Sequence, residues 1–462
     1  MSEDPDFDMK VVKKDTMKER TSGAAAEQDE EPTSGRTLDD LPEIEWVPDD
    51  WDLTTIGEVA ESVVGGGTPL KSEAKYWGGK IPWASVKDLD GTTADSTEDF
   101  ITEEGVENSA TNLIPSGSII VSTRMTVGEA FMNLVDMAIN QDLKAIRPDQ
   151  SRSNTYFLTY ALRGKDEYLK SLGRGTTVSG ITTADLKRTH LSLPPLPEQR
   201  KIASVLYAVD QAIQKTEAII EQATQAQRGL LRELLTEGFN DHETTNAGAL
   251  GEIPTDWRTE KLGQVADVQR GKFTHRPRND PDFYDGAYPF IQTGEVVEAR
   301  GKLTHYSQTL NEKGRGVSKR FDAGTIVITI AGNIGDTAIA TFPIYFPDSL
   351  VGITAGDEVD PYYLEFFLRS RKKYLNRLAT ETTQKNLNLS LLRPIDVALP
   401  PLSEQREIAG VLKGLDSKIR SEKRYTHQLQ SLKRGLMQDL LTGEVRTMDK
   451  AIEVLGEVKA HG

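Results

Sequence analysis

The sequence contains no cysteine, so neither disulfide bonds nor thiolate metal ligands can contribute to its structure. Its apolar runs all fall short of the roughly eighteen consecutive residues that a membrane-spanning helix needs. The chain does not open with a charged segment followed by an apolar one, which is the pattern of a secretory signal. These absences lead us to expect a soluble, cytoplasmic protein with no membrane partner.

Motifs that usually mark enzymes are missing as well. Gly65–Gly67 lacks the Gly-Lys-Ser/Thr ending of a phosphate-binding loop, no Gly-x-Gly-x-x-Gly motif occurs, and no histidine pair has metal-ligand spacing. Asp360–Tyr363 lacks the second proline of an adenine methyltransferase motif, and Asp282 and Asp348 are not followed by the Glu-x-Lys of a metal-dependent nuclease. We therefore expect this chain alone to have no catalytic activity and to bind no metal, S-adenosylmethionine or ATP.

The net charge of −16 is concentrated near the start of the chain. Residues 1–50 contain 16 acidic and 6 basic side chains, whereas the rest of the chain contains 55 and 49. Residues 1–41 are also poor in large apolar side chains, so we predict that they form a disordered acidic tail. The remainder is nearly balanced in charge and can carry a local basic surface despite the acidic total.

The sequence repeats itself with an offset of 206 residues. Residues 193–206 read LPPLPEQRKIASVL and residues 399–412 read LPPLSEQREIAGVL, so 11 of 14 positions are identical. The same offset pairs single residues elsewhere: Pro48 with Pro254, Trp51 with Trp257, Tyr156 with Tyr362, and Leu234 with Leu440. Such a duplication predicts two like modules related by a pseudo-two-fold axis. A protein of this kind suits a target with two halves, and DNA is the foremost example.

Both copies show the same order of predicted local structure. Apolar runs predict a central strand in each copy, at Ser118–Ser122 and Thr325–Ile330. Amphipathic segments then predict a helix in each copy, at Tyr156–Arg163 with Asn154 as N-cap and at Tyr362–Arg369 with Asp360 as N-cap. The mixture of strands and helices indicates an α+β fold with two tandem mixed α/β domains.

Each copy ends in a long segment that predicts a helix of roughly 40 residues, or about 60 Å. The first begins at Pro197-Glu198 and runs to about Thr236. Residues at alternating three- and four-residue steps predict a coiled-coil seam. The seam positions are Ile202, Val205, Val209, Ala212, Thr216, Ile219, Ala223, Ala226 and Leu230 in the first helix, and Ile408, Val411, Leu415, Tyr425, Leu429, Leu432 and Leu436 in the second. We predict that the helices pair as an antiparallel coiled coil; the alternative is that each folds back on its own domain.

Three consecutive polar residues inside the repeated block are identical in both copies. They are Glu198, Gln199 and Arg200 in the first copy and Glu404, Gln405 and Arg406 in the second. A catalytic role is one interpretation. The block follows a predicted strand, however, and a glutamate in the first turn of a helix complements the helix dipole, while glutamine and arginine can hydrogen-bond the neighbouring domain. We therefore favour a role in anchoring domains and subunits over direct chemistry.

The duplicated Leu-Pro-Pro-Leu-x-Glu-Gln-Arg block, placed after a variable α/β region, resembles the specificity subunit of type I restriction-modification enzymes. The openings Val47–Trp51 and Glu252–Trp257, with the Ile56-Gly57 and Leu262-Gly263 pairs, extend the resemblance to roughly residues 42–446. The resemblance implies a DNA specificity subunit, non-catalytic alone, whose two target-recognition domains each read half of a bipartite site in double-stranded DNA. The long acidic tail is not part of this pattern.

The resemblance also implies partners and a role for each part of the chain. The partners are two methyltransferase (modification) subunits and restriction motor-nuclease subunits, through which the complex uses S-adenosylmethionine, ATP and Mg²⁺. The long helices space the domains and dock the methyltransferase subunits. The expected boundaries are a tail at 1–41, target-recognition domain 1 at 42–195, the central spacer helix at 196–238, a linker at 239–250, target-recognition domain 2 at 251–401, the distal spacer helix at 402–445 and a C-terminal tail at 446–462.

Candidate DNA contacts lie in polar loops that occupy the same place in both copies but differ in sequence, as expected of two scaffolds that read different half-sites. In domain 1 the candidates are Thr68, Lys71, Lys75, Lys80, Trp83, Arg124, Arg174, Thr176 and Thr177. In domain 2 they are Arg270, Lys272, His275, Arg276, Arg278, Asn333, Thr382, Thr383, Gln384, Lys385 and Asn386. A single lysine or arginine is more often a solvated surface residue, so each loop as a group is the stronger prediction.

Two other classes of function are open at this point. A structural adaptor, whose coiled coil only joins proteins, would account for the helices but would leave two elaborate domains without a purpose. A nuclease or methyltransferase in a single chain would account for the domains but would need the motifs that are missing.

Overall fold

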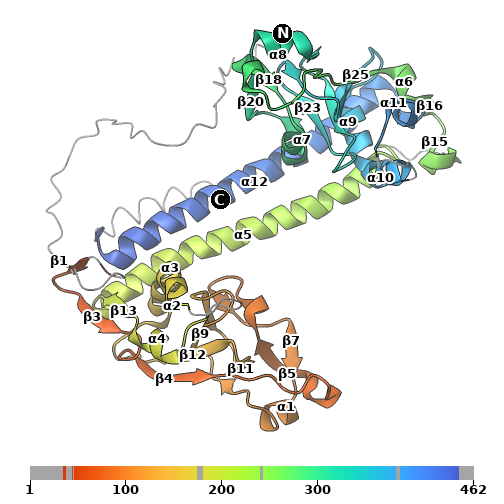
Figure 1. Ribbon diagram of the computed structural model, residues 1–462. Coiled ribbons are helices and arrows are strands. Elements are labelled where there is room, and N and C mark those ends of the chain that lie inside the picture. The colour runs from red at the N-terminus through yellow and green to blue at the C-terminus, as the bar shows by residue number, and fades with distance from the viewer. Residues whose placement is uncertain are drawn as a thin grey trace. The chain divides into compact units, whose positions relative to one another are not determined.

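The computed structural model describes residues 35–37, 44, 46–173, 180–239, 243–380 and 386–446 (Figure 1). The chain divides into two compact units. The domain 1 unit comprises the described residues up to 219 and from 422 onward, and the domain 2 unit comprises residues 220–421. Each unit therefore contains one copy of the repeat and a part of each of the two long helices, α5 (Leu196–Leu234) and α12 (Leu402–Thr442).

The domain 1 unit contains a five-stranded and a four-stranded mixed sheet. The five-stranded sheet has the order β4 (Ala60–Gly65), β12 (Leu143–Pro148), β9 (Ile119–Ser122), β10 (Ala130–Asn133), β6 (Thr93–Ala94). The four-stranded sheet has the order β7 (Asp99–Ile101), β5 (Trp77–Ala84), β11 (Met137–Ile139), β8 (Leu113–Ile114). Two further antiparallel pairs are β3 (Asp52–Thr55) with β13 (His190–Leu193), and β1 (Gly35–Thr37) with β2 (Trp46–Pro48).

The domain 2 unit repeats this arrangement strand for strand. Its five-stranded sheet has the order β17 (Ala266–Arg270), β25 (Leu350–Ala355), β22 (Ile326–Thr329), β23 (Thr337–Ala340), β19 (Gly301–Leu303). Its four-stranded sheet has the order β20 (Gln308–Leu310), β18 (Tyr284–Phe290), β24 (Ile344–Tyr345), β21 (Arg320–Phe321). The antiparallel pairs are β16 (Arg258–Lys261) with β26 (Asp396–Leu399), and β14 (Thr244–Asn246) with β15 (Glu252–Pro254). The predicted duplication is therefore confirmed, because both units have the same strand order. The predicted α+β class is confirmed as well.

The central strands β9 and β22 are buried on both faces, which explains why they read as continuous apolar runs. In β9, Ile119 and Val121 face the core that contains α2 (Thr155–Arg163), and Ile120 faces the core between the two sheets. In β22, Ile326 and Ile328 face the core that contains α9 (Pro361–Ser370), while Val327 faces the opposite core. The two predicted central strands are confirmed.

The helices that follow begin where the sequence predicts. The Asn154 side chain accepts a hydrogen bond from the Phe157 amide at 3.0 Å, and the Asp360 side chain accepts from the amides of Tyr362 and Tyr363 at 2.9 and 3.0 Å. Both N-caps are thus confirmed. Shorter helices complete the units: α1 (Glu103–Glu107), α3 (Asp166–Ser171) and α4 (Thr183–Arg188) in the first, and α6 (Leu262–Val265), α7 (Thr293–Ala299), α8 (Glu312–Val317), α10 (Lys372–Thr380) and α11 (Leu389–Leu392) in the second.

The two long helices pair, and they also pack on the domains (Figure 1). In the domain 1 unit the early turns of α5 share a core with domain 1 and with Leu440 near the end of α12. In the domain 2 unit the early turns of α12, at Ile408 and Leu412, share a core with domain 2 and with Leu234 at the end of α5. The start of one helix therefore meets the end of the other, so the pairing is antiparallel. Each helix begins against its own domain but continues into the other unit, so the alternative that each helix folds back on its own domain is wrong.

The predicted seam is wrong in detail. Ile219 and Val411 are each 41% exposed, and Ala226 is exposed as well. On α12 the buried stripe runs instead through Leu412, Asp416 and Ile419. A straight α-helix drifts by about 20° per heptad from a strict 3.5-residue seam, so the contact stripe passes to the next residue along.

Candidate nucleic-acid interface

The repeated Glu-Gln-Arg block holds the start of each long helix against its domain. Gln199 is fully buried: its Oε1 accepts from the Asn154 amide at 2.7 Å, and its Nε2 donates to the carbonyls of Arg152 and Pro194 at 3.0 and 2.8 Å. Gln405 is also fully buried and makes the same three bonds, to the Asp360 amide and to the carbonyls of Glu358 and Pro400, at 2.9, 3.2 and 2.9 Å. Each glutamine thus ties the first turn of a long helix to the N-cap of the domain helix.

The two glutamates contribute to the same attachment. Glu198 accepts from the Trp51 indole at 3.2 Å and from Arg446 Nη2 at 2.8 Å, and Arg446 also pairs with Asp50, whose pKa it lowers. Glu404 is buried and accepts from the Phe239 amide at 3.3 Å. These contacts stabilise the fold. The arginines of the block, Arg200 and Arg406, instead point to solvent as exposed residues.

In each unit a polar contact joins the long helices at equivalent positions. In the domain 1 unit Asp210 of α5 pairs with Lys433 of α12 at 2.5 Å. In the domain 2 unit Asp416 of α12 accepts from Gln227 of α5. The 206-residue offset relates Asp210 to Asp416 and Gln227 to Lys433, so the two contacts are the same pairing with the helices exchanged.

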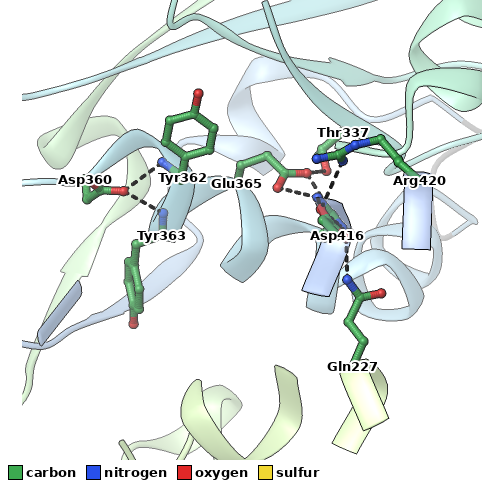
Figure 2. A network of polar contacts seen from close by, with 9 residues as sticks. Gln227, Thr337, Asp360, Tyr362, Tyr363, Glu365, Asp416 and Arg420 are labelled. Atoms are coloured by element: carbon green, nitrogen blue, oxygen red, sulfur yellow. Dashed lines mark hydrogen bonds and ion pairs between the residues drawn. The ribbon is translucent and has the colours of Figure 1, made fainter. Parts of the chain in front are cut away.

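Both aspartates hold their own domain as well. Asp210 accepts hydrogen bonds from the hydroxyls of Thr92 and Tyr160 at 2.5 and 2.7 Å. Burial and, to a smaller extent, the nearby Asp210 carboxylate raise the pKa of Tyr160, so its hydroxyl stays protonated. Asp416 pairs with Arg369 of α9 at 3.0 Å, within the polar network shown in Figure 2. Recognition domains are thereby fixed to the helices by apolar packing and by a buried polar contact.

In each domain, loops at the ends of several strands meet at one edge of the five-stranded sheet. In domain 1, Lys144 pairs with Gly65, and Leu143 pairs with Ser122. The end of β4, the start of β12 and the end of β9 therefore lie together. This edge carries Thr68, Arg124 and the loop before β12, and we call it the domain 1 edge.

Hydrogen bonds link the candidates of the domain 1 edge through two residues that the sequence analysis did not select. Thr68 Oγ1 donates to Gln141 Oε1 at 2.5 Å, Gln141 Nε2 donates to Asp142 at 3.0 Å, and Arg124 Nη1 lies 3.6 Å from Asp142. Gly66 makes this close approach possible, because a Cβ there would lie 2.1 Å from the Ile139 carbonyl oxygen. The polar run Asn-Gln-Asp between two apolar strands is the signal that could have identified Gln141 and Asp142.

Arg174, Thr176 and Thr177 lie outside the described residues. The chain rejoins the domain 1 edge directly after it, where Gly180 forms a β-bridge with Arg124 and the Ile181 amide donates to the Thr123 carbonyl at 2.9 Å. In domain 2, Thr382, Thr383, Gln384 and Lys385 likewise lie outside the described residues, and the Leu387 amide donates to the Ile330 carbonyl at 3.0 Å. Asn386 is half-buried.

The domain 2 edge has the same construction with different side chains. Arg270 Nε donates to the Asp348 carbonyl at 2.6 Å, and the Lys272 amide donates to the Phe346 carbonyl at 3.0 Å. A Cβ on Gly271 would lie 2.3 Å from the Pro347 carbonyl oxygen, so Gly271 permits a close backbone approach in domain 2 as Gly66 does in domain 1. Lys272 and Asn333 are exposed at this edge.

The basic loop of domain 2 is tied down by acidic partners. Asp348 pairs with Arg278 and lies 3.6 Å from Arg276. His275 stacks on Phe283, with 3.9 Å between the ring centroids, and its Nε2 lies 2.8 Å from Asp280. The pKa of Asp280 is lowered by the Asp282 amide and by His275. The loop is therefore ordered, and part of its positive charge is neutralised within the domain.

The remaining candidates of domain 1 lie on or before β5 of the four-stranded sheet. Lys71 and Lys80 are exposed, and Lys75 pairs with Glu104. The candidate DNA contact at Trp83 needs correction, because the Trp83 side chain is only 5% exposed and its indole donates to the Gly67 carbonyl at 3.1 Å. Its large apolar ring belongs to the domain core, and we omit it from the contact surface.

Other kinds of site are not found where the structure describes the chain. Across the described ranges, no three histidine or acidic side chains gather as metal ligands would. Among those same residues, no helix has the length and apolar character needed to cross a bilayer.

The fold and the two edges define a duplicated recognition scaffold, in which like domains anchored to paired helices present unlike loops. Residues 48–225 and again 254–431 match the family model described as "Type I restriction modification DNA specificity domain". The chain therefore belongs to the type I restriction-modification DNA specificity family, and it is a DNA-recognition component with two target-recognition domains.

Similar proteins agree with this assignment. The type I restriction enzyme MjaVIII specificity subunit of Methanocaldococcus jannaschii is 27% identical over 418 residues, which cover 87% of this chain and 94% of that protein. The EcoBI specificity subunit of Escherichia coli is 26% identical over 300 residues, covering 58% of this chain and 60% of that protein. The crystal structure of the S subunit of a type I restriction-modification system from M. genitalium shows the same fold, with a TM-score of 0.60 at 16% identity, over 89% of this chain and 98% of that one.

Proposed function

We propose that each domain reads one half of a bipartite site in double-stranded DNA, and that the domain 1 and domain 2 edges carry the contacts. The observation that supports this proposal is the match between the edges: the same glycine-permitted turn and the same strand order present Thr68, Gln141 and Arg124 in one domain and Arg270, Lys272 and Asn333 in the other. Two domains that share a backbone arrangement but present different polar side chains suit two half-sites of different sequence.

The charge at the domain 1 edge is consistent with a phosphate partner. Lys144 lies beside Arg124, and its pKa is lowered by burial and then by Arg124. Two cations held close together repel each other, and an incoming phosphate relieves that repulsion. Binding of DNA at this edge is therefore expected to fall as salt concentration rises.

Replacing Arg124 with alanine should weaken DNA binding and reduce its salt dependence. If the guanidinium contacts one phosphate, the slope of log K against log salt should become shallower by about 1. Arg147 is the matched control, because its side chain is also 58% exposed and ion-paired, yet it lies toward the other end of β12. Fluorescence anisotropy with a labelled duplex measures the DNA affinity of both variants. If the slope of log K against log salt is the same for Arg124→Ala and Arg147→Ala, Arg124 does not contact a phosphate.

We further propose that the exposed part of the repeated block docks methyltransferase subunits, one on each copy. Pro195, Arg200, Pro401 and Arg406 are exposed and identical between the copies. Two copies of one partner would explain the identity. These partners, with restriction motor-nuclease subunits, would supply the S-adenosylmethionine, ATP and Mg²⁺ chemistry in a cytoplasmic complex.

Arg200→Ala and Arg406→Ala should each weaken binding of one methyltransferase subunit by roughly tenfold, and the double variant should lose both. Arg320→Ala is the control, because Arg320 is an exposed residue of domain 2 that pairs only locally, with Asp322. Native mass spectrometry counts the bound subunits. Full occupancy in the double variant would contradict the docking proposal.

The complete proposal is tested by equilibrium binding of the full chain with its methyltransferase subunits to a library of duplexes. A split sequence motif should be enriched over bulk DNA. If binding shows no sequence preference, the adaptor hypothesis is favoured, and helix fragments that keep every activity would support it.

A further inference from the structure

Met125 is an apolar side chain displayed to solvent at the domain 1 edge. It lies in the loop between β9 and β10 and is 70% exposed, more than any other large apolar side chain among the described residues. A methionine with this exposure contributes little to the core. Its position next to Arg124, rather than its packing, calls for an explanation.

The backbone at Met125 has a conformation that favours glycine. Its φ is 61°, in the left-handed region, and the Thr126 amide donates to the Arg124 carbonyl at 2.8 Å to close a three-residue turn. Ser122 pairs with Leu143 in domain 1 as Thr329 pairs with Leu350 in domain 2, so Met125 corresponds to Gly332. Gly332 has a φ of 72° and open space where a Cβ would be. A side chain at Met125 therefore costs free energy that glycine would avoid.

Hydrogen bonds hold the backbone of this loop in place. Ser122 Oγ donates to the Arg124 carbonyl at 2.6 Å, and the Gly128 amide donates to the Ser122 carbonyl at 3.1 Å. Val127, two residues on, is buried in the core and anchors the other arm of the loop. A strained residue held rigidly and exposed at its tip is typical of a functional position.

The neighbours of Met125 indicate what it touches. Arg124 and Thr126 flank it as exposed polar residues, and the Thr68–Gln141 pair belongs to the same edge. Polar side chains of this kind bind phosphates and base edges, but a thioether gains nothing from a phosphate. The apolar group that a DNA groove offers is the 5-methyl group of thymine.

We propose that Met125 packs against a thymine methyl group in the half-site read by domain 1, and so helps to set the specificity of that domain. This inference rests on the proposed function of the domain 1 edge. Because domain 2 has Gly332 at the same place, the contact belongs to one half-site alone.

The test uses the full chain in complex with its methyltransferase subunits and compares the wild type with Met125→Gly and Met125→Ala. Leu134→Ala is the matched control, since Leu134 is a 46% exposed loop residue beyond the end of β10, at the opposite edge of the sheet. Duplexes carry the cognate site, a non-specific sequence, or the cognate site with single thymines replaced by deoxyuridine. The melting temperature of Met125→Gly should equal or exceed that of the wild type, because glycine relieves the strain.

Both Met125 variants should bind the cognate duplex roughly tenfold more weakly and the non-specific duplex unchanged. One thymine-to-deoxyuridine change in a single half-site should weaken the wild type several-fold and leave Met125→Gly unaffected. If the wild type discriminates but the variants bind equally well, or if every deoxyuridine duplex affects wild type and variants alike, this inference is wrong and the proposed function stands. A wild type without sequence preference overturns both.

Discussion

Replacing Arg369 with methionine is expected to lower the free energy of unfolding of the domain 2 unit by about 3–5 kcal/mol. Arg369 donates to Glu365 at 2.7 Å and to Asp416 at 3.0 Å, and Glu365 is only 1% exposed. Thr337, Gln227 and Arg420 complete the network, which Figure 2 shows around Glu365 and Asp416. Without the guanidinium, two buried carboxylates face each other with little compensation. Urea unfolding followed by circular dichroism measures the change.

The deficit of this variant should depend on pH. Burial raises the pKa of Glu365 above its ordinary value of 4.5, and Arg369 and Thr337 hold it down in part. A carboxyl group whose pKa is raised in the folded state stabilises the fold below pH 4.5 and loses that contribution as pH rises through the folded-state pKa. Removing Arg369 raises that pKa further, so the difference from the wild type should be largest near pH 8 and should shrink toward pH 5.

An exposed ion pair of the same unit provides the control for this prediction. Arg320 lies 2.8 Å from Asp322, and both side chains are largely exposed, so Arg320→Met should change the free energy of unfolding by less than about 1 kcal/mol. A loss in Arg369→Met as small as in this control, or one independent of pH, would mean that the network does not hold α9 to α12.

Replacing Gln405 with methionine is expected to cost the domain 2 unit about 2–4 kcal/mol, and Gln199→Met should cost the domain 1 unit the same. Methionine fills a similar volume but leaves the carbonyl of Pro400 or Pro194 buried without this partner, and it also leaves an amide and a second carbonyl group that are only partly buried. A buried unsatisfied group costs roughly 1–3 kcal/mol, and a partly buried one costs less because water can reach it. The three hydrogen bonds are the same in both units, so equal losses are the specific expectation.

Hydrogen exchange separates the two glutamine variants, because each should speed amide exchange mainly in its own unit. Gln430→Met, at an exposed position of α12, is the control and should change stability by less than about 0.5 kcal/mol. Equal acceleration in both units, or no difference from the control, would contradict the anchoring role of the buried glutamines.

The repeated frame could be predicted from the sequence because its determinants are local. The apolar runs at β9 and β22 and the caps Asn154 and Asp360 act within a few residues, and the duplication shows each kind of signal twice. The seam was harder to place. Ile219 and Val411 are apolar and correctly spaced, but burial on a long helix depends on the partner surface, which no heptad pattern contains.

The site was predicted as loops and not as residues. Arg124, Thr68 and Arg270 lie at the expected edges, whereas Gln141 and Asp142 come to the same edge only through strand pairing. Trp83 shows the opposite error, since composition cannot distinguish an aromatic side chain that stacks on a base from one that fills a core. Met125 was not a candidate from the sequence, because its left-handed backbone conformation does not follow from its residue type.

We propose above that two separable domains each read half of a DNA site. The most direct test exchanges residues 51–192 for the equivalent region of a relative with a different target, and then maps the sequences methylated by the reconstituted complex. We expect a hybrid motif in which one half-site changes and the other is kept. A motif changed in both halves, or methylation without any motif, would contradict it.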